Sequence, residues 1–240
     1  MLYSSINNPK IKELAKLKQK KYRDKQGLFL VEGAHLVKEA YESGFLEELL
    51  ILEDKEFSLD TKTSYITKNV LKYLSDVETP VGIIGVCKFK NTTITGNKLL
   101  ILDSVQDPGN LGTIIRSSAA FNIDTIIIND KCADPYSDKV IRSSQGMIFK
   151  TNIVKKDLYD YLKEIKGKIP IFGTKVTGGK NIKNIEKFQT FAIIMGNEGK
   201  GVDEKLLNLC DEYLYIPMNS KCESLNVGVA TSIILYELTK

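Results

Sequence analysis

The chain has 240 residues, of which 42% are hydrophobic and 27% charged, and its formal net charge is +4. This size allows one large or two small globular domains, and no apolar run approaches the roughly 18 residues that a membrane-spanning helix needs. We find no signal peptide, so we expect a cytoplasmic protein. Four cysteines without Cys-x-x-Cys spacing and a single histidine argue against a zinc site, a disulfide scaffold and a chymotrypsin-like triad.

Positive charge is concentrated near the N-terminus. Residues 10–25 include eight basic and two acidic residues, a local excess of +6. Such a cluster is the expected electrostatic footprint of a protein that binds phosphate backbones, but it also fits a solvated helix face in a lysine-rich protein. Because Ile11, Leu14 and Leu17 recur at helical spacing, residues 8–22 are predicted to form one basic amphipathic helix.

The rest of the N-terminal half alternates strand and helix signals. Strands are predicted at 28–31, 49–52, 65–66 and 81–87, and helices at 33–41 and 67–74. This alternation predicts a compact α/β domain over residues 1–90, followed by a polar linker over 91–97.

A second series of elements fills residues 98–240. Its strands are predicted at 99–102, 125–128, 152–154, 169–173, 191–195 and 213–218, and its helices at 110–121, 137–147, 157–165 and 223–238. Six strands alternating with helices predict a mostly parallel sheet that helices cover on both faces. In such sheets ligands bind in the loops at the carboxyl ends of strands, so we expect a ligand in the last two strand–helix loops.

Two glycine-rich stretches fail to match nucleotide-binding fingerprints. Residues 173–180 lack the Gly-Lys-Ser/Thr ending of a phosphate loop, which disfavours a nucleotide triphosphatase. Gly196, Gly199 and Gly201 have the wrong order and place in the chain for a dinucleotide fingerprint, which disfavours a nicotinamide oxidoreductase. No Gly-x-Ser-x-Gly elbow occurs, so an α/β-hydrolase is not supported.

Two of the remaining segments are loops that follow strands. In the first, Asn110 is expected at a helix N-terminus and Arg116 nearly two turns further on. These residues alone leave open that Asn110 is a helix cap and Arg116 a surface ion-pair residue. In the second, residues 195–201, glycines allow close approach of the backbone to a ligand, and Glu198 could cap the next helix or orient a polar group.

The third segment follows the last predicted strand. Ser224 is a good N-cap residue for the C-terminal helix, whereas Asn226 is a poor helix former with no local reason to stand there. Exposed backbone groups of Ile216, Met218 and Leu225 could hydrogen-bond an adenine or a carboxylate.

Together, the three segments resemble the signature motifs of the SpoU (TrmH) family of RNA ribose 2′-O-methyltransferases, in the SPOUT superfamily. The match covers residues 99–238 in order and spacing. More loosely, residues 28–33 and 74–83 resemble the small L30e-like substrate-binding domain of the family members that modify ribosomal RNA. The resemblance implies an α/β fold with a C-terminal trefoil knot, a homodimer formed around the knot, and a small N-terminal α/β domain.

The resemblance also implies S-adenosylmethionine as methyl donor, bound largely through backbone groups, and no metal. The implied cofactor-binding residues are Gly196, Asn197, Ile216, Met218 and Leu225. The implied catalytic residues are Arg116, Asn110, Glu198, Ser224 and Asn226. The basic residues that we expect to contact RNA are Lys18, Lys20, Lys21, Arg23 and Arg142.

Arg116 is an awkward general base, because the pKa of arginine lies above about 12. We expect it to stabilise the developing alkoxide or to hold the adjacent phosphate, with the proton acceptor left open. The expected activity is 2′-O-methylation of RNA, with 23S ribosomal RNA favoured because of the separate N-terminal domain. The alternatives are a transfer-RNA methyltransferase and a non-catalytic RNA-binding protein of the same fold.

Overall fold

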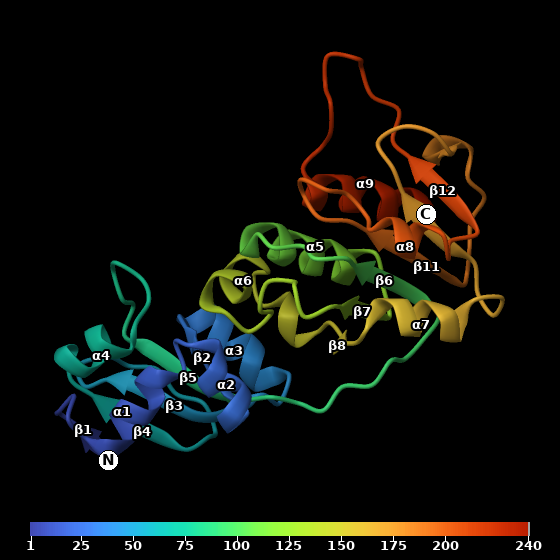
Figure 1. The fold of residues 1–240 in the computed structure, drawn as a ribbon. Coiled ribbons are helices and arrows are strands. Elements are labelled where there is room, and N and C mark those ends of the chain that lie inside the picture. The colour runs from blue at the N-terminus through green and yellow to red at the C-terminus, as the bar shows by residue number, and fades with distance from the viewer. Residues whose placement is uncertain (240) are drawn as a thin grey trace. The chain divides into compact units, whose positions relative to one another are not determined.

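The computed structural model describes residues 1–239 (Figure 1). The chain divides into two compact units. The first consists of Met1–Asn91 and Asp134–Phe149, and the second of Thr92–Ala133 and the residues from Lys150 onward. No helix within residues 1–239 is long and apolar enough to cross a membrane.

The first unit is built on a mixed five-stranded sheet. Its strands, in the order β1-β4-β3-β5-β2, are β1 (Leu2–Tyr3), β2 (Leu28–Glu32), β3 (Leu46–Leu52), β4 (Thr63–Ile66) and β5 (Ile83–Lys88). Its helices are α1 (Pro9–Lys16), α2 (Lys20–Gln26), α3 (Ala34–Glu42), α4 (Lys68–Leu74) and α6 (Asp138–Ser143), and a 3-10 turn, η1 (Met147–Phe149), follows α6. The four predicted strands of this half and the helices predicted at 33–41 and 67–74 are present, and the two-residue strand β1 was not predicted.

The prediction of a single helix over residues 8–22 is wrong. Ile11, Leu14 and Leu17 are buried as expected, but the chain breaks after Leu17 into α1 and α2. The Arg23 guanidinium donates hydrogen bonds to the carbonyl oxygens of Leu17 (2.7 Å) and Lys18 (2.9 Å). A side chain therefore satisfies carbonyl groups that a continuous helix would have paired with its own N–H groups.

Residues 134–149 belong to the first unit although they stand between two strands of the second. Tyr136 packs its ring against Phe29 and Phe89, at centroid distances of 4.8 and 4.5 Å, and Phe149 packs against Phe45 at 5.3 Å. The Arg23 guanidinium also donates to the Asp134 carboxylate, with its Nε at 3.0 Å from Oδ2. Aromatic contact and a buried ion pair therefore hold this segment in the first unit.

The second unit is built on a seven-stranded sheet in the order β10-β12-β9-β11-β6-β7-β8, and all of its strand pairs are parallel. The strands are β6 (Lys98–Leu102), β7 (Thr125–Ile128), β8 (Ile153–Lys155), β9 (Ile171–Thr174), β10 (Lys180–Asn181), β11 (Phe191–Met195) and β12 (Glu212–Tyr215). The helices are α5 (Pro108–Ala120), α7 (Leu158–Ile165), α8 (Glu204–Leu207) and α9 (Val227–Thr239), with a 3-10 turn, η2 (Ile182–Asn184). The predicted parallel sheet is confirmed, and β10 is its one strand that was not predicted.

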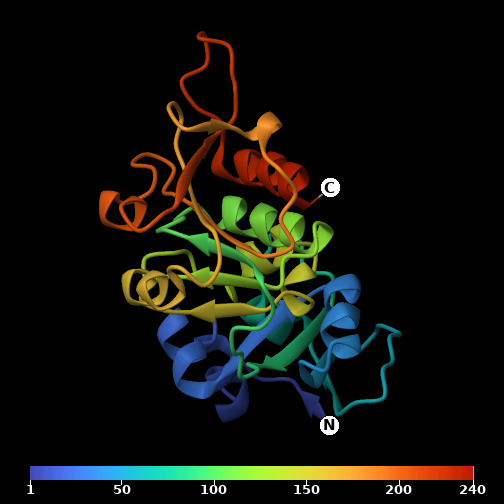
Figure 2. The ribbon, with the colours of Figure 1, turned by 90° about the vertical axis from the view of Figure 1, so that its right-hand side faces the viewer.

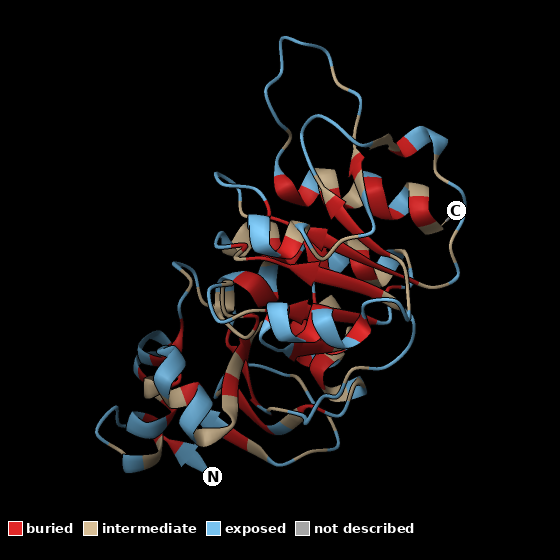
Figure 3. Cartoon of the chain, turned by 45° about the vertical axis from the view of Figure 1, so that its right-hand side comes forward, coloured by how far each residue is buried: buried red, intermediate tan, exposed pale blue. Residues whose placement is uncertain are grey.

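Helices cover both faces of this sheet. Side chains of α7 and α8 share a buried cluster with Leu99, Ile101 and Ile194 of the strands. Helices α5 and α9 pack against each other, and they cover the other face (Figure 2). The central strands β6, β7 and β11 are almost entirely apolar and buried (Figure 3), as expected where a parallel sheet is covered on both sides.

The strand order decides which loops become neighbours. Strand β9 lies between β11 and β12, so the loops that follow these three strands meet at one edge of the sheet. The loop from β12 to α9 is long and mostly exposed, and it projects at the top of Figures 1 and 2.

Arg23 is predicted to stabilise the first unit. Replacing Arg23 by alanine removes the donors to the Asp134 Oδ2 atom and to two carbonyl groups, and removing one partner of a buried ion pair costs about 3–5 kcal/mol. Urea denaturation of Arg23→Ala should therefore show a large loss of stability. Lys21 is exposed on the same helix and serves as the control, because Lys21→Ala should change stability by less than about 0.5 kcal/mol. Equal stabilities of the two variants would contradict the structural role of Arg23.

Candidate functional site

A cavity of about 550 Å³ lies at the carboxyl edge of the second unit's sheet, where the loops after β9, β11 and β12 meet. Its lining includes the predicted residues Gly196, Asn197, Glu198, Ile216, Met218, Ser224 and Leu225. It is completed by apolar side chains from β11, β12 and α9, namely Met195, Leu214, Val227 and Ile234. This volume and a largely apolar lining are typical of a site for a small organic ligand.

The loop after β11 is closed by a tight backbone contact. The backbones of Asn197 and Gly201 exchange two hydrogen bonds, each 2.9 Å long. A Cβ atom on Gly196 would lie 2.1 Å from the carbonyl carbon of Gly201 and 2.2 Å from the nitrogen of Val202. Glycine is therefore required at position 196 because the loop folds back on its own backbone, and this fold shapes one wall of the cavity.

A hydrogen-bonded chain of polar side chains joins three loops at the edge of the cavity. The Asn110 amide nitrogen donates to Glu198 Oε1 at 3.0 Å, and Asn226 Nδ2 donates to Asn110 Oδ1 at 2.8 Å. Glu198 also accepts hydrogen bonds from the backbone nitrogens of Gln106 (3.3 Å) and Asp107 (3.2 Å). Three residues from the three motif segments are thus brought together.

The environment of Glu198 favours its ionised form. Partial burial acts to raise the pKa of this carboxyl group, but hydrogen bonds from the Asn110 amide and from backbone N–H groups outweigh it, so the pKa lies below its ordinary value. Because both Glu198 oxygens accept hydrogen bonds, we infer that the ionised carboxylate holds the loops after β6 and β11 together.

Asn226, rather than Ser224, caps the C-terminal helix. The Asn226 Oδ1 atom accepts hydrogen bonds from the backbone nitrogens of Gly228 (2.9 Å) and Val229 (3.3 Å). The expectation that Ser224 caps this helix is therefore wrong, because the chain becomes helical only at Val227. This cap is the local reason for Asn226, and Ser224 is left exposed at the cavity.

The remaining predicted side chains differ in their surroundings. Asn197 lines the cavity, but its amide is occupied: Oδ1 accepts from the nitrogen of Gly199 at 3.0 Å, and Nδ2 donates to the Ser104 carbonyl at 2.8 Å. Arg116 is exposed on α5 and is not among the residues that line the cavity. Within residues 1–239 the Arg116 guanidinium forms no hydrogen bond or ion pair, so its charge is available to a ligand.

One wall of the cavity was not predicted from the sequence. Thr174, Lys175, Val176 and Thr177, in the loop after β9, and Tyr215, at the end of β12, also line it. The first four belong to the glycine-rich stretch that was set aside because it does not match a phosphate loop. Its position after a predicted strand was the available signal, but the sequence did not show that this strand lies between β11 and β12.

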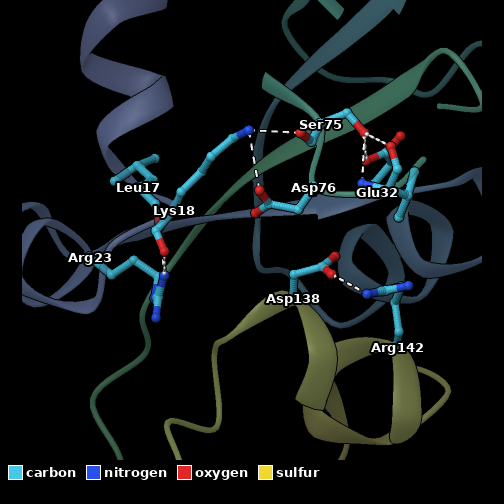
Figure 4. A network of polar contacts seen from close by, with 9 residues as sticks. Leu17, Lys18, Arg23, Glu32, Ser75, Asp76, Asp138 and Arg142 are labelled. Atoms are coloured by element: carbon cyan, nitrogen blue, oxygen red, sulfur yellow. Dashed lines mark hydrogen bonds and ion pairs between the residues drawn. The ribbon is translucent and has the colours of Figure 1, made fainter. Parts of the chain in front are cut away.

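The basic residues expected to bind RNA fall into two groups, and Figure 4 shows Lys18 and Arg142 with their partners. Lys20 and Lys21 are exposed, and Arg142, half exposed, forms an ion pair with Asp138 at 2.6 Å. The Lys18 ammonium group is already engaged within the first unit, because it donates to the Ser75 carbonyl at 2.7 Å and pairs with Asp76 at 3.2 Å.

Arg23 does not fit the predicted role in RNA contact. Its side chain is 7% exposed, and its guanidinium is held by two carbonyl groups and by Asp134. The structure therefore contradicts an RNA-contacting role for Arg23, since its charge is already neutralised inside the first unit.

Each half of the chain matches the model of a known protein family. Residues 97–236 match the model of the SpoU rRNA methylase family, and residues 8–85 match that of the MRM3-like substrate binding domain. The first match confirms the resemblance drawn from the three motif segments.

Individual proteins match over nearly the full length. The chain is 38% identical to the 23S rRNA (guanosine(2553)-2′-O)-methyltransferase RlmP of Bacillus subtilis, over 98% of this chain and 97% of the relative. A crystal structure of an RNA 2′-O ribose methyltransferase is 30% identical and superposes with a TM-score of 0.84, covering 99% of this chain and 98% of the other. An AdoMet-bound rRNA methyltransferase from Sinorhizobium meliloti is 26% identical, with a TM-score of 0.87 and coverage of 99% and 97%.

The family model matches the part of the chain that contains the three motif segments, and the Bacillus subtilis relative matches over nearly the full length of the chain. The chain belongs to the SpoU rRNA methylase family.

Proposed function

We propose that this protein transfers a methyl group from S-adenosylmethionine to a ribose 2′-hydroxyl of 23S ribosomal RNA. The observation that carries this proposal is the cavity at the edge of the parallel sheet, which Glu198 lines and which the hydrogen bonds of Glu198 and Asn110 connect to Asn226. The named activity of the Bacillus subtilis relative supports the choice of substrate, and we propose the position equivalent to guanosine 2553 as the target.

The cavity fits S-adenosylmethionine. Its volume of about 550 Å³ suits a ligand of this size, and its apolar walls suit an adenine ring. Among the described residues, the backbone groups of Ile216, Met218 and Leu225 form no hydrogen bonds, so they are available to a ligand's polar edge. Gly196 and Asn197 shape the opposite loop, Gly196 through its close backbone contact and Asn197 through its amide.

The protein's own contribution to the chemistry is placement and electrostatics. S-adenosylmethionine supplies an activated methyl group on a sulfonium, so no covalent enzyme intermediate is needed. We propose that Glu198, Asn110, Asn226 and Ser224 hold the loops and line the place where the ribose meets the methyl group. We propose that Arg116 contacts the RNA and stabilises negative charge on the 2′-oxygen or the adjacent phosphate.

The first unit is proposed to bind the substrate RNA. Its match to a substrate-binding domain supports this role, and so do the exposed cations Lys20, Lys21 and Arg142. We propose residues 1–90 as this domain, 91–97 as the linker and 98–240 as the methyltransferase domain, with residues 134–149 packing in the first unit. A cytoplasmic location follows from the proposed ribosomal substrate.

We further propose that the protein is a homodimer formed through the second unit. Val229, Ile233 and Tyr236 make an exposed stripe along α9, at spacings of four and three residues that place them on one side of the helix. Exposed apolar stripes of this kind are typical of protein–protein interfaces.

The trefoil knot stays a prediction. The strand order supports it, because the chain runs from β11 to β12 beyond β9 and then returns to α5.

Arg116 is predicted to act on the substrate side of the reaction. Arg116→Ala should lower kcat by about 100-fold or more, because single preorganised charge-stabilising groups contribute this much. Its affinity for S-adenosylmethionine should stay within a few fold of the wild type, since Arg116 does not line the cavity. Methyl transfer to a 23S transcript and calorimetry with the cofactor measure the two effects. A large loss of cofactor affinity would contradict this assignment.

Gly196 is predicted to control cofactor binding instead. A Cβ at this position overlaps the loop backbone, and overpacking of about 1–3 kcal/mol corresponds to a roughly 5- to 150-fold loss of cofactor affinity in Gly196→Ala. Gly199 is the matched control, because a Cβ there meets no atom closer than 3.8 Å. Calorimetry should show that Gly199→Ala binds the cofactor nearly normally. Equal affinities of the two variants would refute the close-contact argument.

The stripe on α9 is predicted to form the dimer interface. The double variant Val229→Glu/Ile233→Glu should be monomeric by light scattering, because charges in an apolar interface are costly to bury. Val81 is similarly exposed, at 47% compared with 46% for Val229, but lies in the first unit, so Val81→Glu should leave the mass unchanged. A dimeric α9 variant would rule out this surface as the interface.

A further inference from the structure

Two lysines stand at the cofactor cavity without an acidic partner. The charged residues among the described lining are Lys175, Glu198 and Lys200. The Glu198 carboxylate is occupied by the Asn110 amide and by the backbone nitrogens of the loop after β6. Neither lysine forms an ion pair within residues 1–239, so the cavity carries positive charge that the protein does not neutralise.

The fold brings these lysines to the same cavity from separate loops. Lys175 directly follows β9 and Lys200 lies in the loop after β11, and β9 and β11 are paired in parallel. Neighbouring strands are about 4.8 Å apart, so the two loops leave the sheet side by side. Both lysines are exposed, although their chain segments line the cavity.

The Lys175 side chain is also held in place. Its ammonium nitrogen lies 3.7 Å from the centre of the Tyr213 ring, and its backbone nitrogen donates to the Leu214 carbonyl at 3.0 Å. A cation over an aromatic face keeps its charge while losing conformational freedom. This arrangement orders the ammonium group before any ligand arrives.

The proposed reaction requires anions at this place. A ribose 2′-oxygen must come within about 3–3.5 Å of the methyl group that it attacks. The phosphodiester on the neighbouring 3′-carbon of the same ribose, and the one on its 5′-carbon, are thereby carried to the mouth of the cavity. Cations without a partner at that mouth are suited to receive them.

We propose that Lys175 and Lys200 bind the backbone phosphates that flank the target ribose and so position its 2′-hydroxyl over the cavity. This inference rests on the proposed function and adds two positioning residues to it. A lysine is a compact point charge without base selectivity, so the pair fixes the register of the RNA strand and leaves the choice of nucleotide to other contacts.

The test compares the double variant Lys175→Gln/Lys200→Gln with a matched control, Lys168→Gln. Lys168 precedes β9, at the opposite end of the strand that Lys175 follows, and it is likewise exposed. The RNA probe is a Bacillus subtilis 23S rRNA transcript that contains guanosine 2553. Its Kd is measured over a range of salt concentrations, and cofactor affinity is measured by calorimetry.

The double variant should bind the transcript about 5-fold or more weakly. The slope of log Kd against log salt concentration should be shallower by about 1.4, because each lost contact with a phosphate of single-stranded RNA reduces the slope by roughly 0.7. Cofactor affinity should be unchanged, and Lys168→Gln should behave as the wild type. A variant with Lys175→Arg in place of Lys175→Gln should regain most of the RNA affinity that the loss of Lys175 removes, because arginine keeps the charge and the contact with Tyr213.

Two results would overturn the inference. One is a salt slope equal to that of Lys168→Gln. The other is a loss of S-adenosylmethionine affinity, which would assign the lysines to the cofactor's carboxylate instead. Failure of the proposed function is distinguishable from both, since it would appear as a wild-type protein that binds the cofactor but does not methylate the transcript.

Discussion

The site depends on one carboxylate, that of Glu198, which ties together loops that are far apart in the sequence. It accepts hydrogen bonds from the Asn110 amide and from two backbone N–H groups of the loop after β6, and Asn110 in turn accepts from Asn226. Hydrogen bonds to an ionised group are roughly twice as strong as neutral ones, and they lower the pKa of Glu198. The same carboxylate that joins the loops therefore stays charged, and its hydrogen bonds go to these loops and not to the lysines at the cavity.

The sheet explains why such a connection is possible. Parallel strands present all of their carboxyl ends at one edge, and the placement of β9 between β11 and β12 gathers three loops there. Gly196 allows the loop after β11 to fold back on its own backbone, while the polar chain of Glu198, Asn110 and Asn226 joins it to α5 and α9. The proposed cofactor cavity and the proposed place for the ribose thus arise largely from main-chain geometry.

In the first unit, neighbouring basic residues serve two different purposes. Lys20 and Lys21 remain exposed and can meet a phosphate backbone, whereas Arg23, three residues after Lys20, is buried and holds Asp134 and two carbonyl groups. Charge clustering in the sequence indicates where RNA would bind, because long-range attraction depends on net charge. It does not distinguish a cation that faces solvent from one that a neighbouring segment has neutralised.

The sequence by itself determined the alternation of strands and helices, the parallel sheet and the three motif segments, because hydrophobic periodicity and loop residues such as glycine and proline are local signals. It also singled out Asn110, Glu198 and Asn226, which the structure joins by hydrogen bonds, although the capping role of Asn226 was assigned to Ser224. Only the tertiary structure decided that β9 lies between β11 and β12, that Lys175 and Lys200 therefore line the same cavity, and that Arg23 is buried against Asp134. These features depend on strand order and on contacts between distant segments, and no local pattern in the chain encodes them.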